Sequence, residues 1–364
     1  MLYPVYSLLF GQTGLSAAQI STLFVIWSLA SFALEVPSGL LADVVSRKLL
    51  IVAAPLVTGA GYALWTFQPG YLAFAAGFML WGMGGALRSG AWEALVYEEL
   101  ARVGASASYA RVIGRSKALG GTASLVASLL ASPVLAMGGG YLALGVASVA
   151  VCVLCALVAL TLPETRGGPG GGDDDEEEAE GGFLAVLRDG LAEVRGAPRL
   201  RTVLVVVALL TGVTAIDEYL PMLAEGTGIA LAAVPLLVLL TDVGAVVGGW
   251  LAGRGVRRLV PVLALGAVCL AAGAAAGTPG FVLVGVAFGV FHWSMAAADA
   301  RLQERVRDRS RATVTSMAGF GAEVVAVLVF GLYGLASAWA RPWEIFLVAA
   351  VAYLPIALAL RRTR

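Results

Sequence analysis

Several ionisable side chains lie inside long apolar runs of this sequence, where a charge is costly. They are Glu35, Arg88, Glu93, Asp217, Glu218, Asp242, His292, Asp299 and Glu323. A charge at the centre of a bilayer costs at least about 2.5–3.5 kcal/mol, so each of these residues needs a reason to be there. A carboxyl group in apolar surroundings can bind and release a proton, which makes this set a candidate proton or substrate pathway.

Arg88 is the clearest case, because it lies near the middle of its apolar run. Counted from the inner end of each run, Arg88 is roughly 15 Å deep and Glu35 is about 12 Å deep. Arg88 and Glu93 are five residues apart and do not share a helix face, so we expect Glu35 to be the partner of Arg88. Two interpretations remain open. The pair is either a static contact that fixes helix packing or a contact whose competition for the arginine couples proton uptake to movement.

The remaining members of the set differ in depth and in chemistry. Asp242 and Glu323 are each about 18 Å deep on the same count. His292 stands next to Trp293, a setting more typical of a packed or substrate-stacking residue than of a proton carrier. Trp81, Trp92 and Trp293 could line a cavity for a flat hydrophobic substrate, although anchoring at the membrane interface explains most tryptophans in such chains.

The elements that must position these residues are apolar throughout. Of the 364 residues, 59% are hydrophobic and 13% charged, and the mean hydropathy is +0.88. A soluble helix keeps a polar face, whereas a span surrounded by lipid is apolar all round. Each run after the first is long enough to cross a bilayer as a helix. The expected runs are 1–13, 21–43, 49–67, 71–97, 112–136, 141–162, 201–223, 230–252, 259–277, 280–299, 312–338 and 343–360.

The basic residues are distributed unevenly between the turns that join these runs. Of the 24 lysines and arginines, 22 lie in one alternating set of turns. The exceptions are Arg88, which lies inside a run, and Arg341, which lies in the other set of turns. Basic turns face the cytoplasm, which predicts a multi-pass protein with its C-terminus in the cytoplasm. Arginine far outnumbers lysine, and Ala and Gly are abundant, which is typical of a GC-rich bacterial genome. We therefore expect the plasma (inner) membrane.

The first run is too short for the topology that the basic turns predict. About 13 apolar residues cover roughly 20 Å, less than the ~30 Å hydrocarbon core. We expect the first helix to be truncated, for example by a mis-assigned start. The alternative is a short, broken first helix.

A polar stretch divides the chain into two parts. Residues 163–199 contain a Gly-rich run and the acidic run 173–178, which is typical of a solvated spacer rather than of a metal-binding or partner-binding tail. Apolar residues at helical spacing from Phe183 predict a short amphipathic helix on the inner surface. The predicted domains are an N-terminal six-helix bundle (1–162), this cytoplasmic linker, and a C-terminal six-helix bundle (200–364).

A short basic pattern occurs once in each half, between the second and third runs and again between the eighth and ninth. The first copy contains Gly39, Leu41, Ala42, Asp43, Arg47 and Lys48, and the second contains Gly249, Leu251, Ala252, Arg254, Arg257 and Arg258. Gly253 stands in the second copy where the first has Asp43. A basic turn repeated at half-length is typical of transporters built from two copies of one helix bundle.

The first copy resembles the signature loop of the major facilitator superfamily, with Ser46 where the family pattern has Gly. The degenerate second copy, the two groups of six runs and the long central linker are similar to that superfamily as well. The resemblance implies an all-α membrane protein with two pseudo-symmetric six-helix bundles and twelve transmembrane helices, the first apparently truncated. It also implies that Asp43 latches the two halves near the arginine-rich turn before the eleventh helix (307–311). The alternative is that Arg47 and Lys48 only satisfy the orientation rule.

The same resemblance assigns candidate positions to the ionisable residues. In the superfamily, helices one, four, seven and ten line a central cavity. The candidates on these helices are Arg88, Glu93, Asp217, Glu218, His292 and Asp299. Glu35 and Glu323 fall on helices two and eleven, which meet between the halves.

The fifth run ends in a pattern similar to the Gly-rich motif of antiporters of the superfamily. Ser128, Ser132 and Ala136 stand in place of glycines, and Pro133 kinks the helix. Because every Gly is substituted, the pattern favours efflux only mildly.

These features favour a proton-coupled secondary transporter that exports a small hydrophobic or drug-like compound. The alternative is an importer or facilitator of a polar metabolite such as a sugar or amino acid, which should carry more Asn, Gln and paired charges inside. A non-transporting receptor or scaffold is a further class. The expected partners are a small-molecule substrate, protons and the lipid bilayer, and the expected state is a monomer.

Other classes lack the residues that they need. The net charge is zero, which gives no case for nucleic acid. A Walker loop needs Gly-Lys, but the two lysines follow Arg47 and Ser116. One histidine makes a metalloenzyme a poor fit, so we expect no enzyme activity, no cofactor and no metal.

Overall fold

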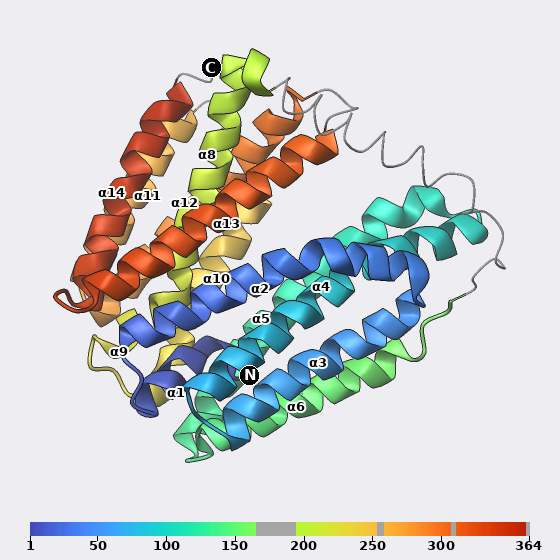
Figure 1. Cartoon of the computed structure of the whole chain (residues 1–364). Helices are drawn as coiled ribbons and strands as arrows, with labels where there is room; N and C mark the ends of the chain where they lie inside the picture. The colour runs from blue at the N-terminus through green and yellow to red at the C-terminus, as the bar shows by residue number, and fades with distance from the viewer. Residues whose placement is uncertain (165–193, 253–257, 307–310, 362–364) are drawn as a thin grey trace. The chain divides into compact units, whose positions relative to one another are not determined.

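The computed structural model describes residues 1–164, 194–252, 258–306 and 311–361, with the side chains of 35–44, 90 and 312 left out. Within these ranges every regular element is a helix, as Figure 1 shows. The all-helical membrane fold predicted from the apolar runs is therefore confirmed. The predicted linker helix from Phe183 and the acidic run lie outside the described residues.

The helices follow the predicted runs to within a few residues at most ends. In chain order they are α1 (Tyr6–Gln12), α2 (Ala17–Val44), α3 (Arg47–Phe67), α4 (Tyr71–Arg102), α5 (Tyr109–Ala136), α6 (Gly140–Ala159), α8 (Pro198–Thr214), α9 (Leu220–Glu225), α10 (Val234–Trp250), α11 (Leu259–Ala275), α12 (Phe281–Gln303), α13 (Arg311–Ala336) and α14 (Pro342–Arg361). The 3-10 segments are η1 (Tyr3–Val5), η2 (Ser106–Ser108), η3 (Ala215–Tyr219), η4 (Leu231–Ala233) and η6 (Thr278–Gly280).

Length and composition mark most of these helices as membrane spans. In the described ranges, nine helical segments are long and apolar enough to cross a bilayer. The 17-residue α11 is a shorter apolar helix, and α1 has 7 residues. The 32-residue α4 carries Arg88, Glu93 and further charges toward its C-terminal end, which lowers its hydropathy.

The seventh predicted run is broken, which the sequence analysis did not anticipate. It forms α8, the 3-10 segment η3 and then the short helix α9. Pro221 stands in the first turn of α9 and has no N–H to donate to the carbonyl of Asp217. An uninterrupted α-helix would lose that hydrogen bond, so the chain tightens into 3-10 geometry here instead.

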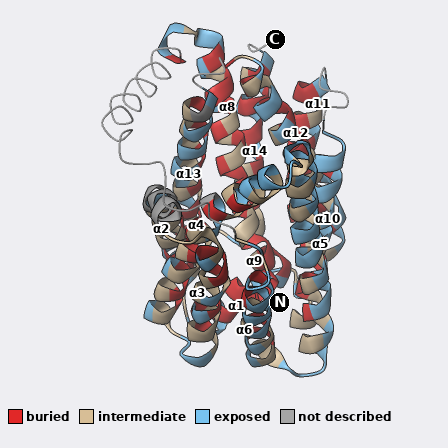
Figure 2. Ribbon diagram, turned by 90° about the vertical axis from the view of Figure 1, so that its right-hand side faces the viewer, coloured by how far each residue is buried: buried red, intermediate tan, exposed pale blue. Residues whose placement is uncertain are grey.

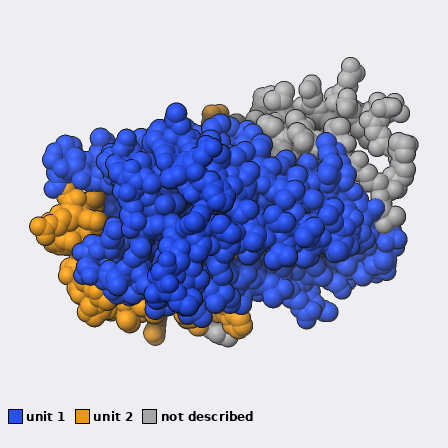
Figure 3. Space-filling model, turned by 90° about the horizontal axis from the view of Figure 1, so that it is seen from below, with its two compact units in different colours: residues 1–166, 219–239, 330–339 blue, residues 167–218, 240–329, 340–364 orange. Residues whose placement is uncertain are grey.

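The described helices belong to two compact units, coloured separately in Figure 3. Unit 1 comprises residues 1–166, 219–239 and 330–339. Within it, α3 packs against α4 and α6, α2 packs against α4, and α1 contacts α2 and α9. α5 is the most exposed of the membrane-spanning helices of this unit (Figure 2). It contacts η4.

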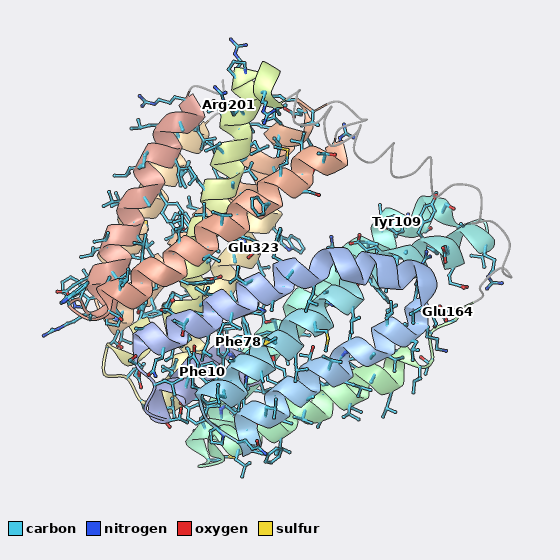
Figure 4. All side chains as sticks on the ribbon, in the orientation of Figure 1. Phe10, Phe78, Tyr109, Glu164, Arg201 and Glu323 are labelled. Atoms are coloured by element: carbon cyan, nitrogen blue, oxygen red, sulfur yellow. The ribbon has the colours of Figure 1, made fainter. Side chains whose placement is uncertain are left out.

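The interior of unit 1 is built from aromatic rings. We call the following set the aromatic cluster: Tyr6, Phe10, Phe24, Trp27, Trp65, Phe74, Phe78 and Trp81. Phe10 and Phe78, labelled in Figure 4, are fully buried with ring centroids 5.8 Å apart. Toward the other end of α3, a smaller aliphatic core joins α3, α4 and α6 around Leu50, Leu95 and Ala156.

Unit 2 comprises residues 167–218, 240–329 and 340–364. In it α11 packs against α12 and α14, and α8 packs against α12 and α14. The third predicted run thus packs on the sixth in unit 1, and the ninth packs on the twelfth in unit 2. The predicted division into domains at 162 and 200 stays a prediction.

Glycines bring the backbones of α10 and α12 together in unit 2. A Cβ atom on Gly244 or Gly248 would overlap the carbonyl oxygen of Gly285 or Gly289, respectively. In return, a Cβ on Gly285 would lie 2.7 Å from the carbonyl oxygen of Leu240. Only glycine permits this approach, which is the close packing that small residues allow between membrane helices.

Candidate functional site

The turn between α2 and α3 carries the first copy of the basic pattern. Ser46 caps α3 by accepting a hydrogen bond from the backbone N–H of Leu49 at 3.0 Å. Its hydroxyl donates to the carboxylate of Glu164, which also accepts the backbone N–H of Lys48 at 3.2 Å. Glu164 therefore ties the segment after α6 to the start of α3 (Figure 4).

The basic side chains of this turn are only partly accounted for by ion pairs. The guanidinium of Arg47 pairs with the carboxylate of Glu98 on α4. Gly39 and Asp43 lie in the last turns of α2, but their side chains fall outside the described part, as do residues 307–310. The latch between Asp43 and the arginine-rich turn therefore stays a prediction.

The second copy of the pattern is described only at its two ends. Gly249 lies near the end of α10, and a Cβ added to it would meet nothing within 4 Å. Arg258 is the exposed residue before α11. Arg254 and Arg257 lie outside the described residues.

Three predicted carboxylates come together in unit 2. We call Asp217 and Glu218 of η3 and Asp242 of α10 the carboxylate group. The carboxyl of Asp217 interacts electrostatically with those of both other members. One carboxylate oxygen of Asp242 is buried and has no hydrogen-bond partner among the described residues. The break at η3 and the depth of Asp242 in its helix thus place like charges near one another.

Polar and aromatic side chains that the sequence analysis missed lie beside this group. The hydroxyls of Thr214 and Tyr353 are 3.3 Å apart, and Tyr353 interacts electrostatically with Asp217. The ring of Tyr353 stacks on Phe291 with centroids 3.8 Å apart and planes 2° from parallel. These residues come from α8, α14 and α12, so three helices of unit 2 converge on the carboxylate group. A single Thr, Tyr or Phe in an apolar run gives no signal that would single it out.

The residues predicted on α4 behave differently. Arg88 is exposed and forms no ion pair with a described side chain. Glu93 lies 3.8 Å from Lys117 of α5, and both side chains are at least half exposed. The side chain of Glu35 lies outside the described part, so the pairing of Arg88 with Glu35 stays a prediction.

The predicted residues of α12 and α13 are spread along their helices. His292 is half-buried between Phe291 and Trp293 in the sequence of α12, and Asp299 is exposed two turns further along. Glu323, labelled in Figure 4, is exposed on α13. Within the described ranges, no group of three His, Cys, Asp or Glu residues could hold a metal ion.

A buried hydroxyl contact links three segments of unit 1. The hydroxyls of Ser21 (α2) and Tyr219 (η3) are 2.7 Å apart, and Tyr219 stacks on Tyr333 (α13) with centroids 3.4 Å apart. We call Ser21, Tyr219 and Tyr333 the hydroxyl junction. A Cβ on Gly334 would lie 2.9 Å from the Cβ of Ser21, so the approach of α13 to α2 requires glycine there.

A second link in unit 1 involves the antiporter-like pattern of α5. The hydroxyl of Ser132 donates to the backbone carbonyl of Ala232 in η4 at 2.6 Å. Pro133 lies inside the helix directly after it. The pattern thus holds the end of α5 against the segment that leads into α10.

Trp81 packs within the aromatic cluster. It stacks on Trp27 at 5.3 Å and on Phe78 at 5.9 Å, measured between ring centroids. Trp27 and Trp81 are half-buried, so part of each ring remains accessible. We call these three residues the ring platform.

Apolar helices of membrane-spanning length, with carboxylates held among them, define an integral membrane protein of the helical-bundle class. Residues 1–329 match the sequence pattern of the Major Facilitator Superfamily. The chain therefore belongs to the major facilitator superfamily, and it is a transporter rather than an enzyme.

Solved structures of transporters are similar over the whole chain. A mutant of the nucleoside transporter NupG gives a TM-score of 0.77 at 15% identity, covering 100% of this chain and 94% of its own. A POT family peptide transporter gives 0.68 at 14% identity (100% and 93%), and a bacterial homologue of the human lysosomal transporter Spinster gives 0.59 at 17% (100% and 94%). At these identities the likeness shows the fold. No curated protein shows significant sequence similarity to the chain.

Proposed function

We propose that this chain is a secondary active transporter that couples proton movement to the export of a small, largely apolar organic compound by alternating access. The observation that carries this proposal is the carboxylate group of unit 2. An unpartnered oxygen of Asp242 near the carboxyl of Asp217 is costly for folding alone, and it is the arrangement that a reversible proton site requires.

The chemistry of such a site follows from the repulsion between like charges. A proton bound by one carboxyl group of the pair removes its charge and relieves that repulsion, and loss of the proton restores it. The hydroxyl of Tyr353 is hydrogen-bonded to that of Thr214, and Tyr353 interacts electrostatically with Asp217. Tyr353 is therefore positioned to respond to a change in the charge of the Asp217 carboxyl. Proton occupancy thereby changes the forces on η3, the segment that joins α8 to α9.

The ring platform supports a flat apolar substrate. The half-buried rings of Trp27 and Trp81, backed by Phe78, offer an aromatic face of the kind on which planar compounds stack. The Ser132–Pro133 pattern of α5 supports export, because it is similar to the antiporter motif. We propose the inner membrane as the location, a cytoplasmic C-terminus and a monomer.

The second candidate is proton-coupled import or facilitated uptake of a polar metabolite such as a sugar or amino acid. The hydroxyl pair of Thr214 and Tyr353 favours it, because hydroxyls can bind a polar solute. Similarity in fold to a nucleoside transporter adds polar solutes with a flat ring to this class.

The test is flux in proteoliposomes that hold the full chain and an imposed pH gradient. A panel of planar aromatic dyes would be compared with nucleosides and sugars. We expect gradient-driven dye flux that is lost in Asp217→Asn and Asp242→Asn and kept in Glu304→Gln, whose side chain is exposed and lies outside the candidate pathway. Dye flux that ignores the gradient, or that survives in both buried variants, would overturn the proton-coupled proposal, and gradient-driven flux of only the polar solutes would select the second candidate.

The predicted coupling carboxylates Glu35 and Glu323, which lie outside the carboxylate group, need a separate experiment. Glu35→Gln and Glu323→Gln remove the carboxylates expected where the two halves meet. Gradient-driven flux that persists unchanged in both variants would remove Glu35 and Glu323 from the coupling pathway.

A further inference from the structure

A long apolar groove runs along α10, α11 and α12 in unit 2. Its volume is about 600 Å³, and valines form most of its walls, including Val243, Val247 and Val286. The floor is lined by the glycines at which α10 and α12 touch, such as Gly248 and Gly289. Several wall residues are exposed, such as Val286 at 48%, whereas Trp293 at one end is buried. An exposed apolar surface of this kind is suited to contact with an acyl chain.

One residue of the groove does not fit this apolar character. Arg258, directly before α11, lines one end, and its side chain is exposed and forms no ion pair with a described residue. The unequal distribution of basic turns puts this end on the cytoplasmic side. An arginine at the inner membrane surface attracts anionic headgroups and donates paired hydrogen bonds to phosphate.

The length of the groove and the occupied glycine faces favour an acyl chain over a helix. The α12 stretch from Val282 to Trp293 along the groove rises roughly 16 Å. The glycine faces that a helix from a second copy would need are already taken by the contact between α10 and α12.

We propose that this groove binds one anionic phospholipid of the inner leaflet, with an acyl chain along the valine walls and the phosphate on Arg258. The site is lined by no member of the carboxylate group or of the ring platform. It makes the packing of α10 and α12 sensitive to the charge of the surrounding lipid.

The experiment is native mass spectrometry of the full chain in detergent with phosphatidylglycerol or phosphatidylcholine of identical acyl chains. Arg258→Gln should lower phosphatidylglycerol binding about fivefold, the effect of about 1 kcal/mol per basic residue at a membrane surface, and leave phosphatidylcholine unchanged. Val286→Phe fills the groove and should lower binding of both lipids.

Matched variants control for charge and for bulk. Arg361→Gln removes an exposed arginine at the same side of the membrane on α14, and Val351→Phe enlarges a valine that is 59% exposed outside the groove. Both should bind as the unmodified chain does. Equal lipid binding in all four variants, an equal loss in Arg361→Gln, or a dimer that Val286→Phe dissociates would each overturn the proposal. Unchanged thermal midpoints verify folding, and Arg258→Gln alters no packed side chain.

Discussion

The interiors of the two units contain different kinds of side chain. Unit 1 is filled with aromatic rings, and its ion pairs among the described residues involve partly exposed side chains. These pairs are Arg47–Glu98, Arg102–Glu99 and Lys117–Glu93. Unit 2 contains like-charged carboxylates around Asp217 and a helix contact made by bare glycine backbones. Among the described side chains, the interior of unit 1 is thus aromatic and uncharged, whereas the interior of unit 2 holds carboxylates.

This difference has an energetic side. Aromatic pairs contribute about 0.5–1.5 kcal/mol each beyond the area that they bury. A buried carboxylate oxygen without a hydrogen-bond partner, such as that of Asp242, instead lowers the free energy of unfolding. We infer that the close packing around α10 and α12 offsets the cost of the carboxylate group. The following predictions test this comparison, from the largest effect to the smallest.

The largest effect is expected where α10 touches α12. Gly244→Ala puts a methyl group into the carbonyl of Gly285, so the helices must separate, and we expect a loss of about 3 kcal/mol in the free energy of unfolding. Gly249→Ala on the same helix adds the same methyl group in open space and should cost nothing. Unfolding in increasing SDS measures both. Equal stability of the two variants would show that the glycine contact does not hold unit 2 together.

A second prediction concerns the cost of the carboxylate group. Asp242→Asn removes a desolvated charge while keeping the shape, so we expect stability to rise by about 2 kcal/mol while gradient-driven flux falls. Because the cost belongs to the ionised form, the gain should be larger at pH 9 than at pH 5. Glu304→Gln, at an exposed position outside the candidate pathway, should change neither quantity. A destabilised Asp242→Asn would mean that the carboxylate holds the fold instead of straining it.

The hydroxyl junction of unit 1 should respond more weakly. Tyr219→Phe keeps the ring on Tyr333 but leaves the buried hydroxyl of Ser21 without its partner, which should cost about 1 kcal/mol. Tyr97→Phe removes an exposed hydroxyl and serves as the control. In a double-mutant cycle with Ser21→Ala, the second substitution should cost less than it does alone. Additive losses would disprove a direct bond.

The smallest effect is expected at the margin of unit 1. Arg47→Gln breaks a partly exposed ion pair with Glu98, so we expect a loss of about 0.5 kcal/mol. Arg102→Gln, which breaks the i,i+3 pair with Glu99, should cost about the same. The loss should vanish at high salt in both variants. A loss of several kcal/mol at Arg47 alone would remove the contrast between charged margin and uncharged interior.

The helices were predictable because each is apolar over most of its circumference and bounded by turn chemistry. α3 begins at the cap formed by Ser46, and Gly104 and Gly138, both at positive φ, follow the ends of α4 and α5. The break at η3 was missed because Asp217 and Pro221 stand in a run that is long enough to span without interruption. Only the proline hinted at it.

The site was predictable in kind but not in arrangement. Asp217, Glu218 and Asp242 stood out because charges in apolar runs are rare. Their neighbours Thr214 and Tyr353 did not, because a hydroxyl gains meaning only from what a distant helix brings to it. The contacts of Ser21 with Tyr219 and of Arg258 with the groove depend on packing between segments far apart in the sequence, which periodicity cannot report.

The 3-10 segment η3 also changes the rotational phase of the helix that follows it. A 3-10 turn advances about 120° per residue where an α-helix advances about 100°, so five residues accumulate roughly 100° of extra rotation and about 2.5 Å of extra length. A helical wheel drawn straight through 198–225 therefore assigns α9 to the wrong side. Relaxation of η3 to α geometry would rotate the chain about the helix axis and turn the hydroxyl of Tyr219 away from Ser21. Asp217 lies in the same five-residue segment, so a change at its carboxyl and the loss of the Ser21–Tyr219 contact would be linked through η3.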